Sequence, residues 1–227
     1  MSDVEAGQVF TYERLLSEIS SFLWEDLTEL ELENAAWAYY YFSVQFRENL
    51  EIACALFPED TGLQQLMREE CNTDNLSPYP GVTAVGERIN HDEFMLRILR
   101  LSPMQDAQKS VLAAAGQHYL DTTRSCAAES RALSITSYED GGLEMVFNAI
   151  LRARCFTTPL LKAFKFFLVE HIKFDSDLEG GHGVLSRGLV PDSRIDPLWQ
   201  AFRDILVTCV PGLNPVRDDI SPEPNYA

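Results

Sequence analysis

The chain has 227 residues, of which 46% are hydrophobic and 11% aromatic, so its length and composition predict one folded domain and exclude a disordered chain. Its formal net charge of −17 argues against binding to nucleic acid or to an anionic membrane surface, because both need a cationic footprint. No run of about 18 apolar residues is present, so no membrane span is predicted.

The five cysteines are an odd number and are scattered along the chain without a CxxC spacing. This pattern is not a disulfide framework, and it indicates a reducing compartment. Residues 1–5 are acidic and lack an apolar run, so no secretory signal is predicted. A cytoplasmic location is therefore expected.

Apolar residues recur at helical spacing in every long segment, and no segment alternates as a strand would. Thr28 followed by Glu31 predicts a capping box that opens a long helix, and residues 35–42 in its middle are apolar nearly all round, as is typical of a central helix. Helices are predicted over residues 11–27, 28–57, 62–70, 82–101, 104–133, 138–153, 157–180 and 198–210. We therefore expect an all-α, single-domain helical bundle of seven to eight helices over residues 1–210, followed by a loose, proline-rich tail over residues 211–227.

Metal-capable side chains occur at helical spacing near the end of the helix predicted over residues 157–180. His171 and Asp175 are four residues apart, and Glu179 follows after another four, so all three share one helix face. An imidazole and two carboxylates on the inner face of a buried helix are costly without a partner, and a metal ion would supply one. The alternative is a helix end with solvated acidic residues, and this segment alone leaves both interpretations open.

Two further segments carry residues of the same kind. Glu87 and His91 are again four apart in a predicted helix, and Glu139 leads into an apolar helix. Carboxylates and imidazoles that converge from several helices of a bundle build dinuclear metal sites, and mixed oxygen and nitrogen ligands suit iron or manganese. Each carboxylate could equally be a solvated helix residue or a partner of a helix dipole.

With these motifs the chain resembles the heme-oxygenase-like diiron oxidases and oxygenases, which share their fold with thiaminase and pyrroloquinoline-quinone synthase. The resemblance rests on three short motifs: Glu87 with His91, Glu139, and the His171-x-x-x-Asp175 unit. The family places a closing histidine seven or eight residues after the first, where this chain has Leu178 and Glu179. His182 follows at eleven residues, so either Glu179 or His182 would close the site.

The resemblance implies a heme-oxygenase-like bundle that binds two iron ions, the second of them weakly. The implied ligands are Glu87, His91, Glu139, His171, Asp175, Glu179 and His182. It further implies an oxidoreductase that activates O2 and oxidises a small organic substrate, such as an amino acid, an amine or a fatty acid, by N-oxygenation, desaturation or oxidative C–C cleavage. The partners expected are the small-molecule substrate and O2, and the oligomeric state is left open, with a homodimer as one option.

Two other functions compete with this expectation. The first is a metal-free enzyme of the same fold that cleaves C–N bonds as thiaminase does, for which Cys126 and Cys155 are the candidate nucleophiles. Neither cysteine has a histidine beside it in sequence, and a cysteine without an activating neighbour usually behaves as a small hydrophobe. The second is a helical interaction protein without catalytic activity, which leaves the paired histidines and carboxylates unexplained.

Overall fold

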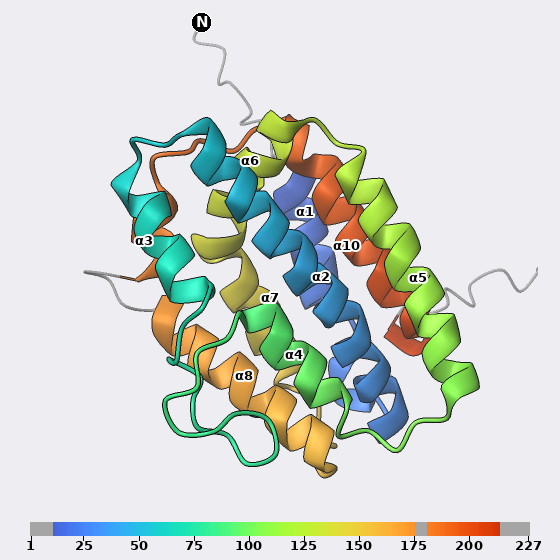
Figure 1. The fold of residues 1–227 in the computed structure, drawn as a ribbon. Helices are drawn as coiled ribbons and strands as arrows, with labels where there is room; N and C mark the ends of the chain where they lie inside the picture. The colour runs from blue at the N-terminus through green and yellow to red at the C-terminus, as the bar shows by residue number, and fades with distance from the viewer. Residues whose placement is uncertain (1–10, 176–180, 214–227) are drawn as a thin grey trace, which may run out of the picture.

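The computed structural model describes residues 11–175 and 181–213, and within these residues the chain is all-helical with no strand. Ten α-helices and three short 3-10 helices follow one another along the described chain, so the predicted all-α bundle is confirmed with more helices than expected (Figure 1). The helices are α1 (Thr11–Ser20), η1 (Trp24–Asp26), α2 (Glu29–Leu56), α3 (Thr61–Glu70), α4 (His91–Leu99), α5 (Asp106–Arg124), α6 (Ala128–Glu139), α7 (Gly142–Ile150), α8 (Pro159–Asp175), α9 (His182–Ser186), η2 (Ser193–Ile195), α10 (Asp196–Cys209) and η3 (Pro211–Leu213).

The longest helix, α2, runs through the middle of the molecule. Its start is the predicted capping box: the Thr28 hydroxyl accepts from the Glu31 backbone N–H, and the Glu31 carboxylate accepts from the Thr28 N–H. In Figure 1, α3, α4 and α8 lie on one side of α2, and α5 and α10 lie on the other. Because it has neighbours on both sides, α2 buries residues around most of its circumference, including Tyr39, Phe42 and Leu50.

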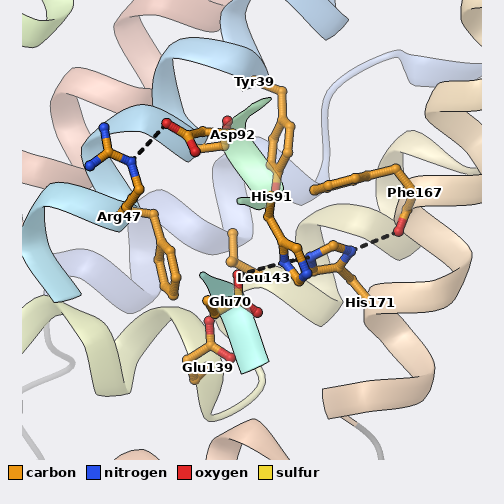
Figure 2. Close-up of a pocket in the computed structure, with 11 residues that line it drawn as sticks. Tyr39, Arg47, Glu70, His91, Asp92, Glu139, Leu143, Phe167 and His171 are labelled. Carbon is orange, nitrogen blue, oxygen red and sulfur yellow. Dashed lines mark hydrogen bonds and ion pairs between the residues drawn. The ribbon is translucent and has the colours of Figure 1, made fainter. Parts of the chain in front are cut away.

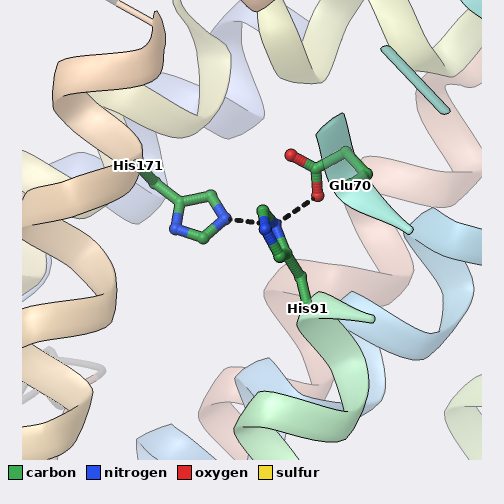
Figure 3. A group of neighbouring side chains, drawn as sticks. All are labelled: Glu70, His91 and His171. Carbon is green, nitrogen blue, oxygen red and sulfur yellow. Dashed lines mark hydrogen bonds and ion pairs between the residues drawn. The ribbon is translucent and has the colours of Figure 1, made fainter. Parts of the chain in front are cut away.

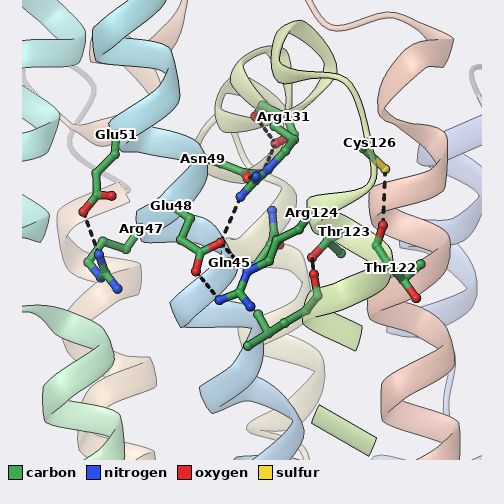
Figure 4. A network of polar contacts seen from close by, with 12 residues as sticks. Gln45, Arg47, Glu48, Asn49, Glu51, Thr122, Thr123, Arg124, Cys126 and Arg131 are labelled. Carbon is green, nitrogen blue, oxygen red and sulfur yellow. Dashed lines mark hydrogen bonds and ion pairs between the residues drawn. The ribbon is translucent and has the colours of Figure 1, made fainter. Parts of the chain in front are cut away.

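A polar network joins α2 to α5 and α6 (Figure 4). The Glu48 carboxylate accepts from Arg124 at 2.5 and 3.0 Å and from Arg131 at 3.0 Å. Arg131 also donates to the Asn49 side-chain oxygen at 2.7 Å. Burial raises the pKa of Glu48, but the two arginines outweigh it and hold that pKa below its usual value. These contacts fix the orientation of α6, whose last residue is Glu139.

Four of the predicted helices have wrong boundaries. The helix predicted over residues 11–27 ends at Ser20 and is followed by the separate 3-10 helix η1. The helix predicted over residues 82–101 begins only at His91, because residues 71–90 form a loop that includes glycines with positive φ at Gly81 and Gly86. The helix predicted over residues 104–133 ends at Arg124, and α6 starts at Ala128 after a short break. Gly141, with φ of 92°, separates α6 from α7, where one helix over residues 138–153 was expected. Helix α9 was not predicted.

The expected tail is described only at its start. Residues 211–213 form η3, and the Leu213 side chain is fully buried. Residues 214–227, and residues 1–10 at the other end, lie outside the described part of the chain. Within the described residues, none of the helices has the length and apolarity that a bilayer crossing requires.

Gly116 of α5 provides a test of how tightly the central helix is packed. A Cβ atom at this position would overlap the ring of Tyr41 in α2. We expect Gly116→Val to lower the free energy of unfolding by about 1–3 kcal/mol through overpacking. Ala114→Val, on the exposed face of the same helix, should cost no more than about 0.7 kcal/mol. Urea denaturation measures both, and equal losses in the two variants would contradict the close α2–α5 packing.

Candidate metal centre

Three buried side chains from three helices meet beside α2 (Figure 3). Glu70 is the last residue of α3, His91 is the first residue of α4, and His171 lies in the last turns of α8. Glu70 is 5% exposed, His91 5% and His171 6%, so water reaches none of them freely. Buried titratable groups of this kind are held only with compensating partners.

His91 is in direct contact with both of the other side chains. His91 Nδ1 lies 2.6 Å from Glu70 Oε2 and 2.9 Å from His171 Nε2. One potential ligand atom from each residue falls within 4.8 Å of the other two, which is the spacing of atoms that can hold a single metal ion. Two nitrogens and one carboxylate oxygen therefore point at one small volume.

The outward-facing nitrogens determine which tautomer each imidazole adopts. His171 Nδ1 donates to the Phe167 backbone carbonyl at 2.9 Å, and His91 Nε2 donates to the Asn75 side-chain oxygen at 2.9 Å. In the neutral imidazoles, His171 Nε2 and His91 Nδ1 then both carry lone pairs and face each other, and His91 Nδ1 also faces the Glu70 carboxylate. The two nitrogens and the carboxylate are all electron-pair donors, so they need a shared proton or a cation between them. Hydrogen bonds from the outer ring nitrogens, such as those to Phe167 and Asn75, are typical of metal-bound histidines.

A second group of ligand-type atoms lies on the other side of Glu70. His182, which begins α9 and is 2% exposed, has its Nδ1 at 3.4 Å from Glu70 Oε1 and at 3.2 Å from Glu139 Oε2. Its other nitrogen, Nε2, lies 3.1 Å from Glu69 Oε2, so an outer acceptor again faces the outward edge of the ring. Among the described residues, the buried Glu70 Oε1 has no hydrogen-bond partner. The two oxygens of Glu70 thus face two different sets of ligand-type atoms.

The electrostatics of the cluster favour the forms of Glu70 and His171 that bind metals. Burial raises the pKa of Glu70, but His91, His182 and His171 lower it to about 2, so the carboxylate is ionised at neutral pH. Burial and the neighbouring His91 lower the pKa of His171 to about 3, so its imidazole is neutral at the same pH. Metal ligands must be deprotonated, and these two residues already are.

The cluster forms one wall of a cavity with an empty volume of about 370 Å³, including the part that is open to solvent (Figure 2). Tyr39, Phe46 and Phe167 contribute aromatic walls, and Asp92 and Arg47 lie at its polar side. Aromatic walls with a few convergent polar groups are the usual lining of a small-molecule site.

Four of the seven ligands expected from the sequence are brought together here: His91, Glu139, His171 and His182. Asp175 ends α8, but its side chain is not among those described, and Glu179 lies outside the described residues. His182, one of the two alternatives for closing the site, is therefore placed in the cluster, and the expectation for Glu179 stays a prediction.

Glu87 was expected to be a metal ligand, and the structure corrects this expectation. It lies in the loop before α4, so helical spacing from His91 does not apply to it. Its carboxylate accepts from Arg97 at 2.7 Å and from the Ala84 backbone N–H at 2.9 Å, and its side chain is one-third exposed. Arg97 and the loop backbone therefore account for Glu87, and Glu70 occupies the position expected for it.

Glu70 was not identified from the sequence, although a signal was present. Leu63, Leu66 and Glu70 recur at helical spacing, and both leucines are fully buried. A carboxylate that continues the apolar stripe of a short helix must be buried with it, and this is the pattern that points to a partner or an ion. Asn75 and Glu69, which contact the outward edges of His91 and His182, carry no comparable signal in the sequence.

Comparisons of the chain with models of protein families, with curated protein sequences and with solved structures found no match. The resemblance given above therefore stays an expectation, and function is inferred from the site itself.

The depressed pKa of His171 predicts how the stability of the metal-free protein depends on pH. Between pH 6.5, its ordinary pKa, and about pH 3, the unfolded state binds a proton that the folded state excludes. Stability should therefore fall as the pH drops below 6.5, and His171 should contribute at most about 1.4 kcal/mol per pH unit to that fall.

We expect His171→Gln to flatten this dependence between pH 6.5 and 5, as measured by urea denaturation at fixed pH. Glu70 adds its own loss only at lower pH, as the pH falls from 4.5 towards 2. The control is His118→Gln, which removes an exposed histidine and should leave the slope unchanged. An unchanged slope in His171→Gln would show that His171 is not buried as a neutral imidazole.

Proposed function

We propose that this protein is an oxidoreductase with a dinuclear non-heme iron centre, which activates O2 and oxidises a small organic substrate. The observation that carries the proposal is the arrangement of three buried imidazoles around the Glu70 carboxylate. His91 turns a nitrogen toward one oxygen of Glu70 and toward the nitrogen of His171, and His182 turns a nitrogen toward the other oxygen of Glu70. The opposite nitrogen of each ring faces an outer acceptor.

The ligand-type atoms divide naturally into two positions that share Glu70. The first would be formed by Glu70 Oε2, His91 Nδ1 and His171 Nε2. The second would be formed by Glu70 Oε1, His182 Nδ1 and Glu139 Oε2. Carboxylates and imidazoles from several helices of a bundle are the ligands of dinuclear iron and manganese proteins, and this donor set lacks the thiolates that structural zinc prefers.

Bound iron would supply the O2 chemistry, as cofactors do, and the protein would supply ligation, orientation and a shielded volume. Asn75 and the Phe167 carbonyl hold His91 and His171 in the tautomers that ligate. The rings of Tyr39, Phe46 and Phe167 line the adjoining cavity and reduce the access of water to it. Exclusion of water strengthens the electrostatic interactions of a bound substrate.

The cysteine-based alternative receives no support from the surroundings of the two candidate thiols. Burial raises the pKa of both Cys126 and Cys155, which disfavours the reactive thiolate. Each thiol lies near a backbone carbonyl, that of Thr122 or Leu27, and neither lines the cavity beside the histidines.

Anaerobic loading of the metal-free protein with Fe(II), followed by removal of free metal and iron analysis, tests the proposal. We expect up to two iron ions per chain in the wild type, and O2 uptake by the loaded protein only. His171→Ala should weaken the first position by more than the roughly 10- to 100-fold loss that follows removal of an outer partner.

Glu87→Gln is the matched control, because the sequence motif includes Glu87 but its carboxylate contacts Arg97 instead of the cluster. This variant should retain the iron content of the wild type. A wild-type chain that retains no iron, or a Glu87→Gln variant that loses it, would contradict the proposed centre.

His182 tests whether the centre is dinuclear. We expect His182→Ala to reduce the iron content from two ions to one, because Glu70 Oε2, His91 and His171 stay in place. His118→Ala, which removes an exposed histidine, serves as the control. If His182→Ala retains both ions, His182 is not a ligand of the second position.

A further inference from the structure

The polar side of the cavity contains an ion pair that the proposed metal ligands do not use. Asp92 follows His91 in the first turn of α4, and Arg47 comes from α2; both line the cavity (Figure 2). Arg47 Nε donates to Asp92 Oδ2 at 2.8 Å. This contact holds the Asp92 carboxylate in place from one side only.

The second oxygen of Asp92 has no such contact. Asp92 Oδ1 is buried and, among the described residues, accepts no hydrogen bond. Asp92 is the second residue of α4, where a carboxylate also interacts favourably with the helix dipole, and neither of its oxygens accepts from a backbone N–H group within the described chain. A buried acceptor without a donor costs about 1–3 kcal/mol, which a ligand with an N–H group would recover.

The positive charge of Arg47 is already compensated by neighbouring carboxylates, so Arg47 would bind an acidic substrate poorly. Its Nη1 donates to Glu51 at 2.6 Å, in addition to the Nε contact with Asp92. Two carboxylates therefore compensate one guanidinium, and they raise the pKa of Arg47 although burial lowers it. The other charged residues that line the cavity are Glu70 and Glu139, both acidic, together with the imidazoles of the cluster. A substrate carboxylate would therefore meet a guanidinium whose charge two carboxylates already compensate.

We propose that the substrate carries a protonated amine, that Asp92 Oδ1 accepts a hydrogen bond from it, and that Arg47 is the positioning residue that orients Asp92. The hydrocarbon part of the amine would lie against the rings of Tyr39, Phe46 and Phe167. This inference rests on the proposed function and narrows its substrate class to small amines and amino compounds, with fatty acids excluded. The net charge of −17 favours the approach of such a cation.

Three probes of equal length distinguish charge recognition from apolar binding: n-butylamine, which is protonated at neutral pH, n-butanol and butyrate. Their binding to the anaerobic, iron-loaded protein is measured by isothermal titration calorimetry at 0.15 M salt, which screens attraction to distant surface charges. We expect butylammonium to bind roughly tenfold or more tightly than the other two probes, the difference that a buried, charge-assisted hydrogen bond supplies.

Asp92→Asn should remove that preference without changing butanol binding, since the amide still accepts from Arg47. Glu51→Gln is the matched control: it removes the same charge from the other partner of Arg47, outside the cavity, and should preserve the preference. Equal affinity of the three probes for the wild type overturns the inference, whatever the folding of the variants. An unchanged preference in a folded Asp92→Asn variant also overturns it.

Iron analysis of the same samples separates this inference from the function on which it rests. Equal probe binding to protein that retains its iron overturns only the amine preference. A wild type that retains no iron contradicts the proposed function, and the inference is overturned with it.

Discussion

The burial of the Glu70 carboxylate is the interaction on which the candidate site depends. An ionised carboxylate removed from water is costly, and a single imidazole does not satisfy both of its oxygens. His91 faces one oxygen and His182 faces the other, while His171 approaches through His91. Because His171 is neutral at physiological pH, any excess positive charge needed to balance Glu70 and Glu139 must come from a shared proton or from a bound cation. The position of one glutamate at the end of α3 therefore sets the chemistry of three histidines.

The two sides of α2 have different roles. Toward α5, α6 and α10 it packs through large buried side chains and through the Glu48 network, which makes this half of the molecule a conventional core. Toward α3, α4 and α8 it contributes Tyr39 and Arg47 to a cavity that Glu70, His91 and His171 also line. The short helices α3, α4 and α9 bury less apolar surface than a long helix does, so ligation of a metal would add directly to the stability of this half.

Much of the helical framework could be predicted because it depends on local pattern. The capping box at Thr28 and Glu31 and the apolar centre of α2 are properties of the sequence itself, and both are present in the structure. The break between Arg124 and Ala128 has no proline or glycine to mark it, so periodicity continued across it in the prediction. The start of α4 was misplaced for a related reason, since Val82 and Ile89 are seven residues apart, as on one helix face, although residues 71–90 form a loop. His91, His171 and Glu139 line one cavity, and their role as ligands stays a prediction, whereas the spacing of a glutamate four residues before a histidine selected Glu87 and not Glu70.

The most direct test of the proposed centre is a crystal structure of the iron-loaded protein with anomalous diffraction measured at the iron absorption edge. The proposed centre predicts an anomalous peak within ligand-bond distance of Glu70, His91 and His171, with the 2.9 Å contact between His91 Nδ1 and His171 Nε2 replaced by bonds to the metal. A second, weaker peak is expected between Glu70, Glu139 and His182. The proposal would be contradicted if iron-loaded crystals had no peak in the cluster and the contacts between Glu70, His91 and His171 were unchanged.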